Sequence, residues 1–465
     1  MVGHPRHGEW ASVMRAAPVR RALVLGWVFW GIAQAQAPAQ PLLGDRAAPP
    51  PTFSVQASLG PAYRSLPPLL PAPELVQAAL LAQPAVQQAH NAKKLASAEQ
   101  QKLNSGSYEW SVRAGLQQRL ETPMDGAARQ HYLDSEIGLE RSLRWPNKAK
   151  TDEQLGQLGH EASDLALGDA WHQAALHLFR DWLEAMRGVS AHARLQEQTK
   201  LGQAQLEVAR RREKAGEASR LEVMLAESEL TRLQVAYDQA DQRSKTQIKA
   251  LLRRYPGLVA PTSWEMPIPA ELPELPEPAP EAWAQALLAG DHQLKLAQAE
   301  VMQFKLRSQR ASQDKVADPL VGMRLARERN SQDQLFGVYI QIPLGGSYRS
   351  AEEGAALARL DMAIDREAEI RLQVETEAHR VSNAVWSSYG LWRQQLRLKA
   401  DTKRNADLAL TAYSLGELPL SEAMQARRVS IEAALASDSA ALDFYEAQGQ
   451  LLINCHELWA EPSEH

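Results

Sequence analysis

The chain has 465 residues, a net charge of -5 and only 6% aromatic residues. Ala, Leu, Gln, Glu and Arg dominate the composition, which is typical of long helices. Because the net charge is small for this length and both signs are mixed throughout, the chain lacks the basic footprint of a nucleic-acid-binding protein. Cys455 is the only cysteine, which excludes an internal disulfide and a lipid anchor on a cysteine at the mature N-terminus.

Residues 1–37 have the pattern of a secretory signal peptide. Arginines precede the apolar run from Ala22 to Ala33, which leads into the small-residue segment A-Q-A-Q-A and predicts cleavage after Ala35 or Ala37. A transmembrane anchor is the alternative, but an apolar run of about a dozen residues is too short to cross a bilayer as a helix. Residues 38–73 are rich in proline and are predicted to form an extended linker.

The first structured segment, residues 74–255, opens with a helical pattern over residues 74–103 that is interrupted at Pro84. Over residues 108–120 apolar and polar side chains alternate, which predicts a strand with one apolar and one polar face. The turn-like sequence T-P-M-D-G follows, and residues 133–143 alternate again. We therefore predict a β-hairpin in this part of the chain.

A very long helix is predicted from Asn147 to Lys214, where proline is absent and apolar residues recur every three or four positions. At 1.5 Å per residue such a helix reaches about 100 Å, which is too long to be buried in a compact domain. The helical pattern breaks at Gly216, and a return helix is predicted from Ser219 to about Arg254.

The second half repeats this order after a proline-rich connector at residues 256–280. The elements predicted within residues 281–458 are a helix over 281–312, strands over 320–327 and 335–344, a long helix over 351–414 and a return helix over 420–456. Residues 459–465 are a short tail.

A short motif supports an internal duplication. Residues 212–226 read R-E-K-A-G-E-A-S-R-L-E-V-M-L-A, and residues 412–426 read A-Y-S-L-G-E-L-P-L-S-E-A-M-Q-A. Aligned without a gap, the two segments share a Gly-Glu pair and then Glu, Met and Ala. Each copy is a short break between two helical runs, as at the turn of a helical hairpin.

The four predicted strands have the length and alternation of strands that cross a bilayer with a tilt. Inside lipid such a sheet has to close, because each unpaired backbone group costs several kcal/mol. Closed membrane barrels begin at about eight strands, so several chains have to share their strands. Polar strand residues are then predicted to line the barrel lumen, namely Glu109, Arg113, Arg119, Asp134, Glu136 and Glu140.

Over nearly the whole mature chain the sequence resembles the TolC family of outer-membrane efflux proteins. The resemblance rests on the two Gly-Glu hairpins, on I-P-L-G-G at residues 342–346, on the opening helix with Pro84, and on the repeated order of strands and helices. It implies a homotrimer with a 12-stranded barrel in the outer membrane of a Gram-negative bacterium and a helical tunnel in the periplasm. It also implies a periplasmic adaptor, or membrane fusion protein, and an inner-membrane pump of the resistance-nodulation-division type.

The predicted fold class is therefore mainly α with a small membrane β-barrel, built from internally duplicated long helical hairpins with four strands per chain. Residues 415–417 and the sequence C-H-E-L-W at residues 455–459 are similar to outer-membrane components of cobalt-zinc-cadmium efflux systems, which implies a role in metal resistance. The first half departs from the family pattern, because it reads L-R-W-P-N-K at residues 143–148 where Pro-Leu-x-x-Gly-Gly is expected. The lipidated cysteine of many relatives is also absent.

The predicted hairpin tips are the candidate site for gating or adaptor docking. They comprise Gly216, Glu217, Ser219, Gly416, Glu417 and Pro419. Two interpretations of the glutamates stay open. In the first, the glutamates of three chains gather at the periplasmic mouth, where they favour cations or orient the adaptor. In the second, the glycines end the helices and the glutamates are only solvated.

No catalytic residue, cofactor site or metal site is predicted. A nucleophile with a base, a phosphate-binding loop and a pair of carboxylates are all missing as recognisable patterns, so the chain is not expected to be an enzyme. The four histidines between residues 160 and 192 do not share one helix face, and Cys455 with His456 forms an isolated pair. The histidines are therefore interpreted as solvated or packed side chains.

Together these features predict a passive conduit, the outer-membrane channel of a tripartite efflux system for metal ions or small toxic molecules. Two alternatives remain. One is a type I protein secretion channel, since the predicted tunnel alone does not show which cargo passes through it. The other is a periplasmic coiled-coil adaptor or scaffold, although a soluble scaffold has no reason to keep four alternating strands. The sequence leaves open the cargo and the identity of the pump and adaptor.

Overall fold

A computed structural model of the chain describes residues 70–122, 124, 128–259 and 280–461. The predicted signal peptide lies outside the described residues, and so do residues 38–69 of the predicted linker and residues 260–279 of the predicted connector. Residues 462–465 of the predicted tail are also outside them.

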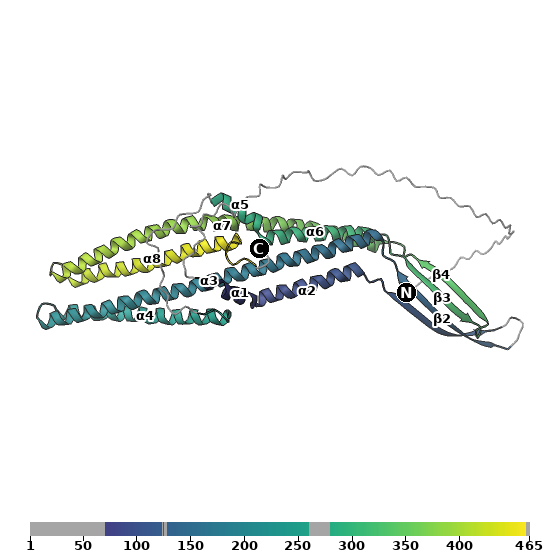
Figure 1. Ribbon diagram of the computed structural model, residues 1–465, viewed down its shortest axis with the longest axis horizontal. Coiled ribbons are helices and arrows are strands. Elements are labelled where there is room, and N and C mark those ends of the chain that lie inside the picture. Colours follow the sequence, from purple (N-terminus) through teal and green to yellow (C-terminus); the bar gives the residue numbers. More distant parts are fainter. Residues whose placement is uncertain (1–69, 123, 125–127, 260–279, 462–465) are drawn as a thin grey trace, which may run out of the picture. The chain divides into compact units, whose positions relative to one another are not determined.

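The described chain has the same order of elements in each half, namely two helices, two strands and two helices (Figure 1). The elements of the first half are α1 (Pro73–Leu81), α2 (Pro84–Ser105), β1 (Trp110–Glu121), β2 (Gln130–Ser142), α3 (Pro146–Lys214) and α4 (Arg220–Arg254). The elements of the second half are α5 (Pro280–Gly290), α6 (His292–Gln313), β3 (Leu320–Glu328), β4 (Asp333–Gln341), α7 (Ser347–Ser414) and α8 (Leu420–Asn454).

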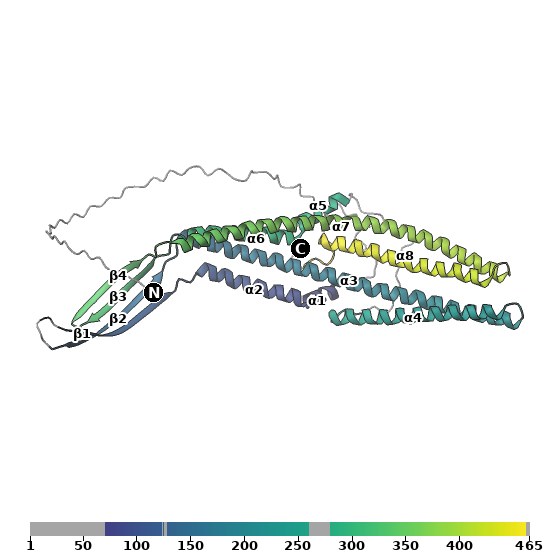
Figure 2. The same ribbon diagram turned by 180° about the vertical axis from the view of Figure 1, so that it is seen from behind.

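Two helical hairpins make up most of the described residues. α3 and α7 have 69 and 68 residues, so each is about 100 Å long at 1.5 Å per residue. α3 packs along α4, and α7 packs along α8, as Figures 1 and 2 show. α2 packs on α3, and α6 packs on α7. The predicted long helices and their return helices are therefore confirmed.

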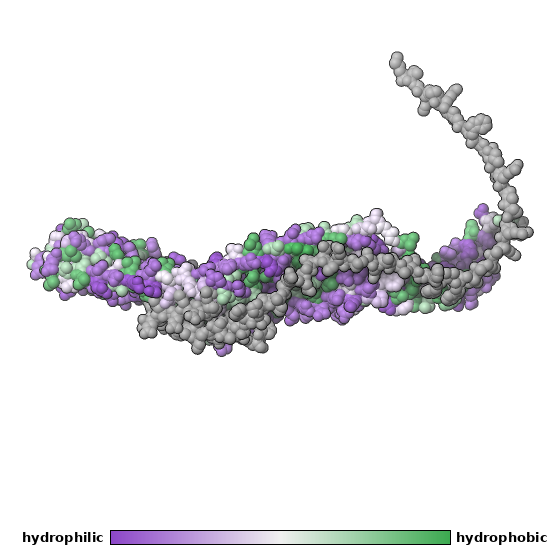
Figure 3. Space-filling view, turned by 90° about the horizontal axis from the view of Figure 1, so that it is seen from above, coloured by the Kyte–Doolittle hydropathy of each residue, from purple (hydrophilic) through white to green (hydrophobic). Residues whose placement is uncertain are grey.

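The apolar side chains gather in separate clusters instead of one central core. One cluster includes Phe179 of α3, and another joins Trp283, Trp392 and Phe444 from α5, α7 and α8. α8 approaches α3 closely at Gly449, where an added Cβ atom would lie 1.9 Å from the ring of Phe179. Figure 3 shows hydrophilic and hydrophobic residues interspersed over the visible face of the helices, as expected for long helices with narrow apolar stripes.

Among the described residues, no helix combines the length and the apolarity that a membrane crossing requires.

The four strands form one antiparallel sheet in the order β1-β2-β3-β4. Its register places four apolar residues in one row across the sheet, because Val112 pairs with Leu139, Leu139 with Met323, and Met323 with Val338. Since side chains alternate between the faces of a strand, this register collects most of the large apolar residues of both hairpins on one face. Most of the charged residues of β1 and β2 then lie on the opposite face, with Arg141 as an exception.

Several predicted boundaries differ from the structure; β2, for example, begins at Gln130 instead of residue 133. The helix predicted over residues 281–312 is divided into α5 and α6 at Asp291, whose carboxylate accepts a hydrogen bond of 2.8 Å from the backbone N–H of Leu294. Asp291 thus acts as an N-cap and begins a second helix. β4 ends at Gln341 instead of residue 344, and α7 begins at Ser347 instead of residue 351, because Gly346 serves as the N-cap of α7.

The segment between β2 and α3, together with the first turn of α3, is held by contacts to the segment that follows α6. Lys148 is 1% exposed, and its Nζ lies 2.8 Å from Asp314 and 3.0 Å from Asp318. The indole N–H of Trp145 donates to the carbonyl of Ala317 at 2.9 Å. Burial alone would raise the pKa of Asp314, but hydrogen bonds from Arg310 and Lys148 hold it below its usual value. A buried lysine thus orders the segment in which the sequence departs from the expected glycine pattern.

Candidate functional site

Both hairpin tips end their first helix in the same way. Gly216 has a φ of 77° and Gly416 a φ of 79°, the left-handed region that favours glycine. At the first tip the N–H of Glu217 donates to the carbonyl of Arg212 at 2.9 Å, and the N–H of Gly216 donates to Glu213 at 3.0 Å. The second tip repeats both hydrogen bonds, 200 residues later in the numbering, with the same two lengths. In this Schellman pattern the residue after the helix is left-handed, which explains why glycine stands at both positions.

The two return helices begin differently. Ser219 is the N-cap of α4, and its hydroxyl accepts a hydrogen bond of 3.3 Å from the N–H of Glu222. Pro419 occupies the equivalent position before α8 and offers no side-chain acceptor. Both residues therefore start a helix, and only the serine satisfies a backbone donor of the first turn with its side chain.

The glutamates of the tips are solvent-exposed. The side chain of Glu217 is 66% exposed, and its carboxylate lies 3.8 Å from Nε of Arg212. Glu417 is exposed as well. An exposed ion pair at this distance contributes little to stability, so both carboxylates face water and are available to ions or to another protein.

A contact between the two tips was missed by the sequence analysis. Arg212 of α3 lies over the ring of Tyr413 of α7, with 4.8 Å between its guanidinium carbon and the ring centroid. The hydroxyl of Tyr413 donates to the carboxylate of Glu222 in α4 at 3.0 Å. Burial, together with the hydrogen bond to Glu222, raises the pKa of Tyr413, so the hydroxyl stays a donor at neutral pH. We call Arg212, Glu222 and Tyr413 the tip contact.

An apolar cluster packs against the tip contact. It consists of Leu206, Ala209, Val223, Ala226, Leu420 and Met424, with Tyr413 packed against it. The signal that could have pointed to this contact lies in the two copies of the motif. Arginine stands at position 212 where the second copy has Ala412, and tyrosine stands at 413 where the first copy has Glu213.

The sheet brings most of the predicted lumen residues together on one face. The register pairs Ser111 with Glu140 and Gly115 with Glu136, so these positions share a face with Arg113. Arg119 and Asp134 lie on that same face by alternation along β1 and β2. The exception is Glu109, which precedes β1 and is exposed.

Ion pairs cross this polar face from strand to strand. Arg113 lies 3.0 Å from Glu140, and Arg119 lies 2.9 Å from Asp134. The second half adds groups that the sequence analysis did not name. Arg119 also lies 2.6 Å from Glu328 of β3, and Tyr339 of β4 donates to Glu140 at 2.5 Å. The polar face therefore carries ion pairs across β1, β2 and β3, and β4 adds a hydroxyl that donates to one of the carboxylates.

The opposite face of the sheet exposes many large apolar side chains. Their exposed fractions run from 44% at Met323 to 77% at Leu116. The residues are Trp110, Val112, Leu116, Leu120, Leu133, Ile137, Met323, Leu325, Phe336, Val338 and Ile340. A contiguous apolar surface of this kind is the mark of a contact with lipid or with another protein. We call it the apolar face.

We compared the sequence and the fold with those of known proteins. No protein-family model and no curated protein matches the sequence. Among solved structures, the outer-membrane channel OprN has a TM-score of 0.70 and 15% identity, with 83% of this chain and 90% of that chain covered. The chain has the fold of an outer-membrane channel. The CmeC channel of Campylobacter jejuni has a TM-score of 0.67 at 13% identity, covering 84% of this chain and 86% of that one.

A third outer-membrane protein, VceC of Vibrio cholerae, has a TM-score of 0.66 at 12% identity, covering 82% of this chain and 95% of that one. The predicted architecture, mainly helical with a small antiparallel sheet of four strands, is confirmed in this fold. At such low identity the similarity concerns the outer-membrane channel fold itself.

Proposed function

We propose that the chain is the outer-membrane component of a tripartite efflux system, a passive conduit and not an enzyme. The observation that carries this proposal is the two-sided sheet, with an exposed apolar face and a face crossed by ion pairs. Lipid would cover the apolar face, and water in a lumen would solvate the charged face. The similarity to outer-membrane channel folds supports the same conclusion.

Closure of the sheet would require more than one copy of the chain, and we propose three. β1 and β4 are the edges of the four-stranded sheet, and their exposed backbone groups would be costly in lipid. All neighbouring strands are antiparallel, so β4 runs opposite to β1 and can pair antiparallel with β1 of the next copy. Three copies of four strands then give a closed barrel of 12 strands, above the minimum of about eight.

The helical hairpins would form the periplasmic tunnel of the conduit. Their tips would meet a periplasmic adaptor, and the adaptor would join an inner-membrane pump of the resistance-nodulation-division type. We further propose that the tip contact holds the periplasmic end of the tunnel narrow, because it ties α7 to both helices of the first hairpin. An internal duplication would account for the two hairpins.

Single-channel recording in planar bilayers tests the conduit. Purified protein is expected to produce discrete current steps, and the absence of any conductance at all would contradict the proposal. The cargo we propose is a metal ion, as the resemblance at residues 415–417 and 455–459 implies, or a small toxic molecule. A deletion strain should then lose resistance to metals or drugs, whereas a defect confined to protein secretion would favour the type I alternative.

The glutamates at the tips are proposed to favour cations at the periplasmic mouth. Two glutamates per chain in three chains would place six carboxylates there, where clustered charge raises the local cation concentration. Replacing Glu217 and Glu417 together by glutamine is expected to lower the cation over anion permeability ratio several-fold at low salt. The measurement is the reversal potential of single channels in a salt gradient.

A matched control distinguishes the effect of charge at the tips from the effect of charge elsewhere on the helices. Glu207 is also exposed on α3, but it lies before the tip, and Glu207→Gln is expected to leave the permeability ratio unchanged. An unchanged ratio in the double tip variant would favour the interpretation that the glutamates are only solvated.

A further inference from the structure

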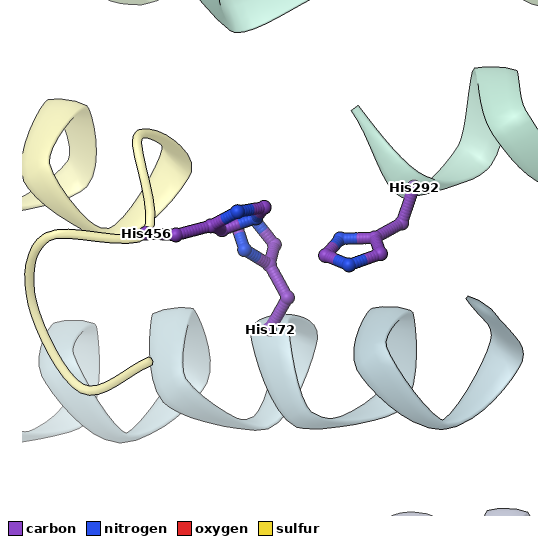
Figure 4. A group of neighbouring side chains, drawn as sticks. All are labelled: His172, His292 and His456. Carbon is purple, nitrogen blue, oxygen red and sulfur yellow. The ribbon is translucent and has the colours of Figure 1, made fainter. Parts of the chain in front are cut away.

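Three histidines from distant parts of the chain meet in one place. His172 lies on α3, His292 is the first residue of α6, and His456 follows the end of α8. Figure 4 shows the three imidazole rings gathered between these elements. One ring nitrogen from each histidine lies within 4.8 Å of the other two. The ring centroids are 4.7 Å apart for His292 and His456 and 5.5 Å apart for His172 and His456.

This spacing is close to what a metal ion requires. Zinc binds histidine nitrogen at about 2.0–2.1 Å, so nitrogens around one tetrahedral ion lie roughly 3.4 Å apart. If the side chains rotate so that each ring nitrogen moves by about 1 Å, the three nitrogens reach that separation. Imidazole is a ligand for zinc, cobalt, nickel and copper, whereas magnesium and calcium prefer oxygen. The chemistry of the cluster therefore selects a divalent transition metal.

The backbone at His456 gives a second, independent observation. α8 ends with the same hydrogen bonds as the two tips, from the N–H of Glu457 to Leu452 and from the N–H of His456 to Ile453, both 2.9 Å. The left-handed position of this motif holds glycine at both tips, but here it holds His456 with a φ of 58°. A side chain there costs about 1 kcal/mol. A histidine at this left-handed position is explained if a function of its side chain offsets the backbone cost.

The other two histidines are held in place by their surroundings. His292 is 7% exposed, and its Nε2 would lie 2.7 Å from a Cβ atom added at Gly168, so a glycine of α3 makes room for the ring. Nε2 of His172 lies 2.9 Å from Oδ1 of Asn454. Such a partner fixes the orientation of a metal-binding imidazole.

A cavity beside the rings gives an ion and water a way in. Its volume is about 280 Å³, and the three histidines, Asp169 and Asp291 are among its lining residues. Its lining holds the carboxylates of Asp169, Asp291 and Glu377 against the single guanidinium of Arg180, so the excess charge is negative and favours a cation. Water in this cavity can complete the coordination of an ion that has three protein ligands.

We propose that His172, His292 and His456 bind one divalent transition-metal ion, such as Zn²⁺, and that the ion clamps the segment after α8 to α3 and α6. The ion is a resident of the helical wall and not the transported cargo. The proposal is independent of the conduit function, because it rests on contacts within one chain.

Cobalt binding to the full-length protein in detergent tests the site. The protein should carry no polyhistidine tag, and Co²⁺ is added in steps while the visible d–d absorption is recorded. We expect absorption that saturates at one Co²⁺ per chain and that Zn²⁺ removes, whereas Mg²⁺ has no effect. His172→Gln and His292→Gln are expected to weaken Co²⁺ binding at least tenfold, on the order of the loss seen when metal sites are perturbed. His160→Gln, on the same helix as His172, is the matched control.

Thermal unfolding distinguishes a metal ligand from a structural residue. Zn²⁺ should raise the unfolding temperature of the wild type, because the ion binds only the folded site, and EDTA should reverse the shift. His456→Gly removes the ligand and relieves the left-handed backbone, so the metal-free variant should be at least as stable as the metal-free wild type but insensitive to Zn²⁺. A His456→Gly protein that keeps the full Zn²⁺ shift, or a wild type that binds no Co²⁺, would overturn the proposal.

Discussion

Leu116→Arg is expected to prevent stable assembly in the membrane, whereas Gln117→Arg is expected to leave assembly intact. Leu116 is 77% exposed on the apolar face, and Gln117 is its neighbour on the polar face, paired in register with Asp134. Arginine on a lipid-facing strand costs about 2–4 kcal/mol near the bilayer midplane. In three copies the summed free-energy cost would be roughly 6–12 kcal/mol, which is comparable to the whole free energy of unfolding of a typical protein.

Membrane fractionation measures this effect. Wild type and Gln117→Arg should stay in the membrane pellet after a salt wash and require detergent for extraction, while Leu116→Arg should be lost from the pellet or degraded. The pair controls for the added charge and for the size of the side chain, since the same residue is introduced at adjacent positions. Equal membrane association of both variants would mean that lipid does not cover the apolar face.

Tyr413→Phe is expected to increase the open probability of single channels about tenfold or more. The substitution keeps the ring under Arg212 but removes the hydroxyl that donates to Glu222. A hydrogen bond to a charged group contributes about 1.5–3 kcal/mol, and each 1.4 kcal/mol is a factor of ten in an equilibrium. The partial exposure of the tip places the effect at the lower end for one chain, and concerted opening of three chains would add to it.

Planar bilayer recordings compare Tyr413→Phe with two other variants. Arg212→Ala removes the guanidinium from the ring of Tyr413 and should change the channel in the same direction. Tyr348→Phe removes a hydroxyl from a side chain that is 79% exposed at the start of α7, and should behave like the wild type. If Tyr413→Phe and Tyr348→Phe gave the same open probability, the tip contact would have no part in gating.

The sequence predicted the elements that depend on local patterns. Alternation of apolar and polar residues located the strands, because side chains of a strand alternate between its faces. Gly216 and Gly416 located the ends of the long helices, because a left-handed residue closes the Schellman motif. The break at Asp291 was missed although a signal was present, since glycine followed by aspartate commonly ends one helix and begins the next.

Contacts between distant segments could not be predicted in the same way. Arg212 meets Tyr413, and Arg119 meets Glu328, only because the two halves of the chain lie side by side. The histidine cluster is the strongest example, because its residues come from α3, from α6 and from the segment after α8, and they share no local spacing. Sequence spacing compares His172 only with the other histidines of its own helix and His456 only with Cys455, so it cannot reveal that both meet His292.

Native mass spectrometry of the detergent-solubilised protein decides whether several copies share their strands. The four-stranded sheet leaves β1 and β4 as edges, so we expect particles that contain three chains and no stable monomer. A stable monomer in mild detergent, with its sheet intact, would contradict the shared barrel and with it the proposed channel.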